Sequence, residues 1–377
     1  MKIAVNTRLL LPEKLDGIGW FTYETLKRIT QTHPEHEFIF IFDRKYHDEF
    51  IFSENITPVI AHPQARHPAL WYLFFEFGIP PVLKRYHPDL FFSPDGWLSL
   101  KAQIPALAVI HDLNFFHDPQ WVSRLPRYYY NYFFPRYIKH ATRLATVSEF
   151  SRKDISSRFA IPESSIDLVY NGVNNMYSPV PEIEQQKIRN RYSNGRPYFL
   201  FLGLVHPRKN LTRIINAYEV FRRSQPDNVK LLVAGSTKYR TKDTKDAYER
   251  SAFKHDIIFT GRVPDRELNG ILGSSLSLVY TSLFEGFGIP ILEAMQCNVP
   301  VITSDVTAMP EVGGEAVLYT DPYSVESISS AMIRIYKDES LRCHLIAKGS
   351  NQLQKFSWDM TAEKLWESIL TTVQTPN

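Results

Sequence analysis

Short apolar runs alternate with helical patterns along the whole chain, and this alternation constrains the fold more than any other feature. The first series of expected strands comprises Lys2 to Asn6, Phe38 to Phe42, Thr57 to Ile60, Leu90 to Phe92, Ala106 to Ile110, Leu144 to Val147 and Ile166 to Val169. The second comprises Tyr198 to Leu202, Val229 to Ala234, Ile257 to Thr260, Ser275 to Tyr280, Val299 to Thr303 and Ala316 to Tyr319. Such alternation is typical of parallel sheets covered by helices on both faces. The sequence therefore predicts an α/β protein with two doubly wound sheets.

The chain length and its proline-rich middle indicate two domains. A chain of 377 residues exceeds the usual size of one hydrophobic core. Residues 174–197 contain Pro179, Pro181 and a Ser-Asn-Gly-Arg-Pro break, which are typical of an interdomain connection. We expect an N-terminal domain over residues 1–178, a C-terminal domain over residues 179–355 and a final helix within residues 356–377.

Composition excludes several classes of function. The 43 basic and 40 acidic residues nearly cancel, which gives no indication of nucleic-acid binding. Cys297 and Cys343 are far apart and have no metal-binding spacing, so neither a disulfide framework nor a metal site is expected. The chain opens on a strand and has no run of eighteen apolar residues, so we expect a cytoplasmic protein.

The segment Val279 to Cys297 predicts a strand, a glycine-rich turn and a helix. Gly286 and Gly288 allow the backbone to approach a ligand, and the helix start adds unpaired amides, so an anion suits this turn. Glu285 and Glu293 flank it, and a carboxylate there is better placed to accept from neutral hydroxyls than to meet a phosphate. A nucleotide sugar carries both groups, whereas an ordinary strand-turn-helix with solvated glutamates is the alternative.

Two further strand ends carry candidate ligand groups. Arg208 and Lys209 follow the strand Tyr198 to Leu202 and are suited to clamp a diphosphate, although alone they also fit a solvated basic turn. His111 follows the strand Ala106 to Ile110, and from spacing alone a role within its loop is favoured.

Glycines near the N-terminus define another loop. Gly17 and Gly19 lie in a predicted loop over Leu15 to Gly19, and because the third glycine of a dinucleotide fingerprint is missing, an NAD site is not indicated. A plain tight turn is the alternative.

Glu285 and Glu293 with the intervening Gly-Phe-Gly-Ile resemble the paired-glutamate motif of the retaining glycosyltransferases of family 4, which are also called group 1. The resemblance implies a GT-B architecture, in which two Rossmann-like domains face each other across a cleft and the last helix returns to the first domain. It implies catalytic roles for His111, Arg208, Lys209 and Glu285. It implies donor-binding roles for Gly17, Gly19, Gly203, Gly261, Val263, Gly286, Phe287, Gly288, Ile289 and Glu293.

One position departs from the family pattern. Many members have arginine directly after the first glycine of the loop that carries Arg208, where this chain has Leu204. Arg208 is therefore the expected substitute for the missing cation.

The resemblance also implies the reaction. We expect transfer of a hexose from a nucleoside-diphosphate sugar to a hydroxyl of a glycan or lipid-linked acceptor, with retention of anomeric configuration and without a metal or other cofactor. The form of the 203–210 loop is similar to that of mannosyltransferases, so GDP-mannose is the first candidate donor, ahead of UDP-sugars. A GT-B sugar-nucleotide epimerase and a catalytically silent nucleotide-sugar-binding subunit are the alternatives.

Two aromatic stretches, Trp71 to Phe77 and Tyr128 to Tyr137, allow two interpretations. With the flanking residues Arg127, Arg136 and Lys139, they could form a surface for an acceptor or for peripheral contact with the inner face of a membrane. Apolar residues surround the second stretch nearly all the way round, so packing in the core is the competing interpretation.

Overall fold

Contacts within the chain divide it into two compact units. The computed structural model describes residues 1–375 apart from 13–14, 226 and 237–240. The first unit combines Met1–Gly172 with Ser357–Asn377, and the second contains Val173–Phe356. The boundary expected after residue 178 therefore lies after Gly172, and the segment expected to begin at 356 begins at Ser357.

Residues just after Gly172 belong to the second unit for an identifiable reason. Tyr177 is 4% exposed and its hydroxyl interacts with Glu293, and the Ser178 amide donates to the Asn269 side chain at 2.9 Å. These contacts attach the connecting segment to the second unit before its first helix begins. The prolines that suggested a boundary at 178 lie within the connection and not at its start.

The first unit contains a parallel sheet of seven strands in the order β3-β2-β1-β4-β5-β6-β7. The strands are β1 (Lys2–Asn6), β2 (Glu37–Phe42), β3 (Ile56–Ile60), β4 (Leu90–Ser93), β5 (Ala106–Ile110), β6 (Arg143–Thr146) and β7 (Ile166–Leu168). Chain order reverses between β1 and β4, and in open sheets such a switch point leaves a crevice beyond the carboxyl ends of the strands.

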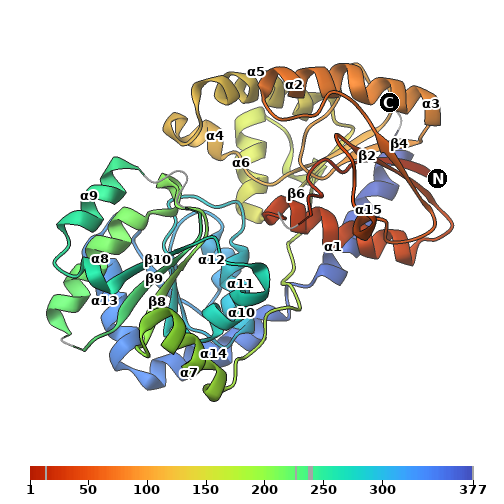
Figure 1. The fold of residues 1–377 in the computed structure, drawn as a ribbon. Coiled ribbons are helices and arrows are strands. Elements are labelled where there is room, and N and C mark those ends of the chain that lie inside the picture. Colours follow the sequence, from red (N-terminus) through yellow and green to blue (C-terminus); the bar gives the residue numbers. More distant parts are fainter. Residues whose placement is uncertain (13–14, 226, 237–240, 376–377) are drawn as a thin grey trace. The chain divides into compact units, whose positions relative to one another are not determined.

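Helices cover this sheet, as Figure 1 shows. They are α1 (Gly17–Thr32), α2 (Pro68–Leu73), α3 (Ile79–Tyr86), α4 (Asn114–His117), α5 (Arg124–His140), α6 (Glu149–Phe159) and α15 (Trp358–Gln374). A π-helical turn over Phe74–Gly78 joins α2 to α3. The terminal helix α15 packs beside α1, and the Arg28 guanidinium bonds Asp359 at 2.5 Å. Ser148 caps α6 by accepting from the Ser151 amide.

The second unit contains a parallel sheet of six strands in the order β10-β9-β8-β11-β12-β13. The strands are β8 (Tyr198–Leu202), β9 (Lys230–Ala234), β10 (Ile257–Gly261), β11 (Ser277–Tyr280), β12 (Val301–Ser304) and β13 (Leu318–Thr320). Here the switch point lies between β8 and β11. The two parallel sheets confirm the predicted α/β class.

The helices of the second unit lie on both faces of its sheet (Figure 1). They are α7 (Glu182–Ser193), α8 (Leu211–Ser224), α9 (Lys242–Arg250), α10 (Asp265–Gly273), α11 (Ile289–Gln296), α12 (Met309–Gly313), α13 (Val325–Lys337) and α14 (Glu339–Leu353). Met309-Pro-Glu311 reads in the sequence as the opening of a loop, but this segment forms α12. Pro310 stands in its first turn, where a missing amide hydrogen costs no helical bond.

In the part of the chain that the structure describes, every helix is too short or too polar to serve as a membrane span.

Candidate functional site

Two loops meet at the switch point of the second sheet, one after β8 and one after β11. The Leu283 amide donates to the Arg208 carbonyl oxygen at 2.8 Å. Asn210 lies in the left-handed region with a φ of 63°, and its amide group donates to the carbonyls of Thr281 and Pro322 at 2.9 and 2.7 Å. Because Asn210 is 3% exposed, these bonds hold the two loops in one arrangement.

Arg208 and Lys209 both lie against Glu285. The Arg208 Nη1 atom is 2.6 Å from Glu285 Oε2 and also donates to the Phe284 carbonyl at 2.7 Å. The Lys209 Nζ atom is 2.7 Å from Glu285 Oε1 and 2.7 Å from the Tyr280 hydroxyl. The two cations and one carboxylate therefore form a cluster with a net positive charge.

This cluster is poorly accessible to water, which makes its charges strongly coupled. The side chains of Arg208, Lys209 and Glu285 are 19%, 14% and 9% exposed. Burial alone would raise the pKa of Glu285, but Arg208 and Lys209 outweigh it and lower the pKa to about 2. Burial raises the pKa of Tyr280, with Glu285 adding to the effect, so the phenol stays neutral.

Three strand-end turns adjoin one another in this unit. Gly203 follows β8 with a φ of 133°, and its amide donates to the Ala234 carbonyl at 2.9 Å. Gly235 follows β9, where a Cβ would come within 1.8 Å of the Gly203 oxygen. Its amide donates at 2.8 Å to the carbonyl of Gly261, which has a φ of 70°. A Cβ on Gly203 or Gly261 would meet no described atom within 4 Å, so both turns are open to a ligand. The nearby Val263 is 6% exposed.

The glycine-rich turn leads into α11 as the sequence indicates. Gly288 has a φ of 113° and caps the helix, and a Cβ on it would lie 3.8 Å from the Tyr280 ring. Tyr280 thus lies between this turn and Lys209, so the cations and the helix start belong to one site. Gly286 and Phe287 are buried, and Ile289 begins the helix with Pro290 in its first turn.

Glu293 projects from α11 toward the connecting segment. It is half-buried, and its carboxylate interacts with the Tyr177 hydroxyl. Burial raises the pKa of Glu293 to about 7, while the Tyr177 bond and the charge of Lys209 oppose the change. Near neutral pH this group is therefore divided between its charged and uncharged forms.

We expect Glu293→Gln to stabilise the second unit at pH 8 and to leave its stability at pH 5 nearly unchanged. The folded pKa of about 7 lies above the ordinary 4.5, so ionisation lowers stability as pH rises from 4.5 to 7. The full shift corresponds to at most about 3 kcal/mol, and partial exposure reduces this to about 1 to 2 kcal/mol. Calorimetric melting temperatures at the two pH values measure the effect, and the exposed Glu184→Gln is the control. An equal gain at both pH values contradicts the expectation.

His111 lies in the first unit, at the carboxyl end of β5. Its Nε2 atom is 2.8 Å from the Pro94 carbonyl oxygen, which can only accept, so Nε2 carries the hydrogen. Burial lowers the pKa of His111, although the Pro94 bond opposes this. A neutral ring that donates through Nε2 has an accepting Nδ1 atom. His111 is therefore suited to accept a hydrogen bond from a hydroxyl.

The expected loop over Leu15 to Gly19 is wrong in its second half. Gly17 is the first residue of α1 and Gly19 lies in its first turn, because Asp16 caps the helix by accepting from the Gly19 amide at 3.0 Å. A Cβ on Gly19 would lie 3.2 Å from the Leu9 carbonyl oxygen, so this glycine permits close backbone approach.

The structure brings together Arg208, Lys209 and Glu285 directly, with the turn before α11 joined to them through Tyr280. His111, Gly17 and Gly19 belong to the other unit. Sequence reasoning missed the polar residues that organise the cluster, namely Asn210, Tyr280 and Tyr177. Asn210 and Tyr280 directly adjoin predicted site segments, which was a usable signal, whereas Tyr177 is far away in the sequence. Across residues 1–375, with the gaps given above, no three His, Cys, Asp or Glu residues gather as metal ligands would.

Solved structures with the same architecture define the fold class. A sucrose-phosphate synthase from Thermosynechococcus elongatus aligns over 100% of both chains with a TM-score of 0.78 and 16% identity. A glycosyltransferase from Rickettsia africae covers 100% of this chain with a TM-score of 0.74, 17% identity and 99% of its own length. These two similar structures therefore support the GT-B fold, with two Rossmann-like units.

Sequence comparisons go further than the fold. The model described as Glycosyltransferase Family 4 matches residues 15–175, and the model described as Glycosyl transferases group 1 matches residues 182–352. The chain belongs to this family of glycosyltransferases.

Two curated relatives match over most of their length. O-antigen chain mannosyltransferase B of Escherichia coli is 28% identical over 356 residues, which are 92% of this chain and 93% of the relative. O-antigen chain mannosyltransferase RfbU of Salmonella typhimurium is 28% identical over 306 residues, 81% of this chain and 80% of the relative.

Proposed function

We propose that the protein transfers a hexose, with mannose from GDP-mannose as the first candidate, to a hydroxyl of a saccharide acceptor with retention of anomeric configuration. The observation that carries this proposal is the cluster of Arg208 and Lys209 on Glu285 at the switch point of the second sheet. The names of the two O-antigen mannosyltransferases support mannose as the sugar and a glycan as the acceptor.

The cluster suits departure of a nucleoside diphosphate. Negative charge grows on the diphosphate as the bond to the sugar breaks, and preorganised donors stabilise that charge by about 3 kcal/mol each. Arg208, Lys209 and the amides from Gly286 to Ile289 are the proposed donors. In this proposal these donors supply the positive charge, and no metal ion is needed. We therefore expect activity to persist in EDTA, and loss of activity in EDTA contradicts metal independence.

The remaining groups are proposed to hold the donor. Glu285 accepts from sugar hydroxyls while it orients Arg208 and Lys209, and Glu293 accepts from the ribose. His111 accepts from a sugar hydroxyl through Nδ1. The turns at Gly203, Gly261 and Val263 are proposed to contact the base, and Gly17 and Gly19 are proposed as further donor-binding residues. The leaving phosphate takes the acceptor proton, so the chain needs no separate base.

A panel of nucleotide sugars tests the proposal. Purified protein is incubated with GDP-mannose, UDP-glucose and UDP-galactose, with and without octyl mannoside, and products are followed by NMR. Transfer with an α-linked product supports a retaining transferase, and slow donor hydrolysis supports a transferase without testing retention. Isomerised sugar supports the epimerase alternative. Binding without any turnover supports a silent nucleotide-sugar-binding subunit.

We further propose that one surface of the first unit contacts an anionic membrane. Leu125, Tyr128 and Tyr132 lie on one face of α5 and are 60%, 67% and 54% exposed. Phe77, from the π-helical turn, is 53% exposed, and the Lys101 ammonium lies 3.5 Å from its ring centroid. Exposed aromatic and basic side chains together fit a lipid interface. The opposite side of α5, including Phe134 and Tyr137, is buried, so core packing holds for that side and membrane contact is proposed for the exposed face alone.

We expect the double variant Leu125→Ser, Tyr128→Ser to bind vesicles containing phosphatidylglycerol about tenfold more weakly than the unchanged protein. Burying even one such side chain in the lipid interface stabilises binding by about 1.5 kcal/mol or more, and about 1.4 kcal/mol corresponds to a tenfold change in affinity. Cosedimentation measures the difference. Ile183→Ser, at a position in the second unit that is 77% exposed, is the matched control. Equal binding by all three proteins contradicts a role for α5.

A further inference from the structure

Side-chain hydroxyls continue the contact between β11 and β12 beyond the ends of the two strands. The strands pair as far as Tyr280 and Thr303, and the Thr303 hydroxyl donates to the Tyr280 carbonyl at 2.9 Å. The Ser304 hydroxyl donates to the Ser282 carbonyl at 2.6 Å. The loop after β12 therefore follows the loop after β11 toward the candidate site.

Thr307, in the loop after β12, contacts the candidate site itself. The Glu285 amide donates to the Thr307 hydroxyl at 3.2 Å, and this hydroxyl donates its own hydrogen to the Met309 sulfur at 3.5 Å. The carboxylate of Glu285 is paired with Arg208 and Lys209. Glu285 is thus held from two sides, by Thr307 at its backbone and by two cations at its carboxylate.

The backbone of Thr307 is strained. Its φ of 56° lies in the left-handed region, where the Cβ of an ordinary residue is crowded and a β-branched residue is an outlier. Among the residues that the structure describes, no other β-branched residue has a positive φ. The remaining non-glycine residues with a positive φ are asparagines or end a helix, which are ordinary reasons for it. They are His87, Ala160, Asn194, Asn210 and Asn298.

This strain coincides with a contact to a candidate catalytic residue. Strained backbone persists only where the surrounding structure imposes it, and it gathers at functional sites. Thr307 is half-buried and lies two residues before α12 begins, so termination of a helix does not account for its conformation. What accompanies the conformation is the bond between the Thr307 hydroxyl and the Glu285 amide.

The Glu285 amide stands at the entrance to the glycine-rich turn. Gly286 and Gly288 lie in this turn, and α11 begins directly after it at Ile289. Because glycine permits many backbone conformations, the position of such a turn depends strongly on how its two ends are held. The start of α11 holds one end, and the bond to Thr307 holds the other.

We propose that Thr307 is a positioning residue for cleavage of the donor. It fixes the backbone of Glu285, and through it the amides from Gly286 to Ile289, in the arrangement that receives the departing diphosphate. Thr307 acts through Glu285 and does not itself touch the substrate. This inference rests on the proposed transferase activity, which assigns the diphosphate to this turn.

Thr307→Val and Thr307→Ser test the role of the hydroxyl. Valine replaces the hydroxyl with a methyl group, and with GDP-mannose and octyl mannoside we expect kcat to fall about tenfold to 100-fold, because a displacement of about 1 Å near the reacting groups costs about 100-fold. The KM for GDP-mannose should change less than about threefold, since the lost stabilisation belongs to the departing diphosphate. Serine keeps the hydroxyl, so Thr307→Ser should retain kcat within about threefold of the unchanged protein.

Thr320→Val is the matched control. The Thr320 hydroxyl donates to the Thr303 carbonyl at 3.1 Å, and Thr320 is 3% exposed. The same substitution there removes a buried hydrogen bond between β13 and β12 and leaves the bond to Glu285 in place. We expect its melting temperature to fall, because a buried carbonyl loses a partner, while kcat stays at the wild-type value.

Wild-type kcat in Thr307→Val overturns the inference. An equal loss of kcat in Thr307→Ser or in Thr320→Val also overturns it, because the loss would then not depend on the hydroxyl that bonds Glu285.

Pyrophosphate separates this inference from the proposed activity. If the unchanged protein turns over no nucleotide sugar, the transferase proposal fails and pyrophosphate binding decides the role of Thr307. Pyrophosphate carries the charge that develops on the leaving group, so its dissociation constant should rise about fivefold to tenfold in Thr307→Val and stay unchanged in Thr307→Ser and Thr320→Val. Titration calorimetry measures these constants. Equal binding by all four proteins, or binding by none, overturns the positioning role.

Discussion

Lys209→Ala is expected to lower kcat roughly 100-fold to 1,000-fold, because it removes one preorganised donor from the proposed diphosphate site. The Lys209 ammonium contacts both Glu285 and the Tyr280 hydroxyl, so its position is defined before any ligand binds. Folding should be little affected, since Glu285 keeps its bond to Arg208. Steady-state turnover of GDP-mannose and the melting temperature measure the two effects.

Lys187→Ala is the control, because it removes a lysine side chain of the same charge and length from another position in the second unit. Lys187 also pairs with a glutamate in the second unit, at 3.0 Å from Glu184, but its side chain is 67% exposed. A surface pair of this kind contributes little, so both kcat and melting temperature should match the unchanged protein. Wild-type kcat in Lys209→Ala would remove Lys209 from the mechanism.

Glu285→Gln is expected to lower kcat about 100-fold and to reduce the stability of the second unit by about 3 kcal/mol or more. Removing one charge of a poorly exposed ion pair leaves its partners uncompensated, and here two cations lose the same carboxylate. Because the pKa of Glu285 is about 2, below the ordinary 4.5, the stabilisation is complete above pH 4.5 and is lost as pH falls toward 2.

Pyrophosphate distinguishes an anion site from a structural ion pair. If Arg208 and Lys209 bind the diphosphate, pyrophosphate should raise the melting temperature of Glu285→Gln more than that of the unchanged protein, since it replaces the missing negative charge. Glu219→Gln breaks a pair with Arg223 on the surface of α8 and should respond like the unchanged protein. Equal shifts in all three proteins would contradict binding of pyrophosphate in place of the missing carboxylate.

Much of the fold was predictable because buried strands leave a strong local signal. The fully buried run Ala106–Ile110 can satisfy its backbone only inside a sheet, and the sequence places β5 at these residues. Short polar segments are less informative. Met309-Pro-Glu is typical of a loop, yet Pro310 suits the first turn of α12. Gly17 and Gly19 suggested a loop, yet Asp16 caps α1 and Gly17 is its first residue.

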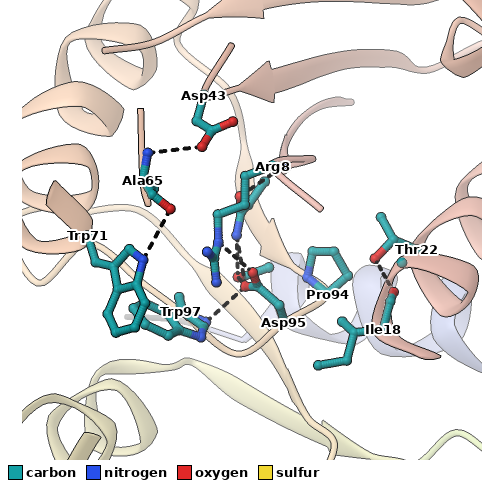
Figure 2. Close-up of polar contacts among 12 residues, drawn as sticks. Arg8, Ile18, Thr22, Asp43, Ala65, Trp71, Pro94, Asp95 and Trp97 are labelled. Atoms are coloured by element: carbon teal, nitrogen blue, oxygen red, sulfur yellow. Dashed lines mark hydrogen bonds and ion pairs between the residues drawn. The ribbon is translucent and has the colours of Figure 1, made fainter. Parts of the chain in front are cut away.

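The candidate site was predictable only in part. Arg208, Lys209 and Glu285 could be selected because they follow strands whose carboxyl ends meet at one edge of a sheet. Their mutual pairing could not, because it depends on the strand order that places β8 beside β11 and on the bonds of Asn210 across the two loops. For the same reason the ion pair between Arg8 and Asp95, shown in Figure 2, could not be predicted, because these two residues become neighbours only where β1 pairs with β4.

By itself the sequence determined the alternation of strands and helices, the division into two α/β series and the motif that resembles a glycosyltransferase, since each depends on residues close together in the chain. Tertiary structure decided which charges meet, the raised pKa of Glu293 and the lowered pKa of Glu285. The physical reason is that ion pairing and desolvation depend on distances and burial in space, and residues far apart in sequence set both.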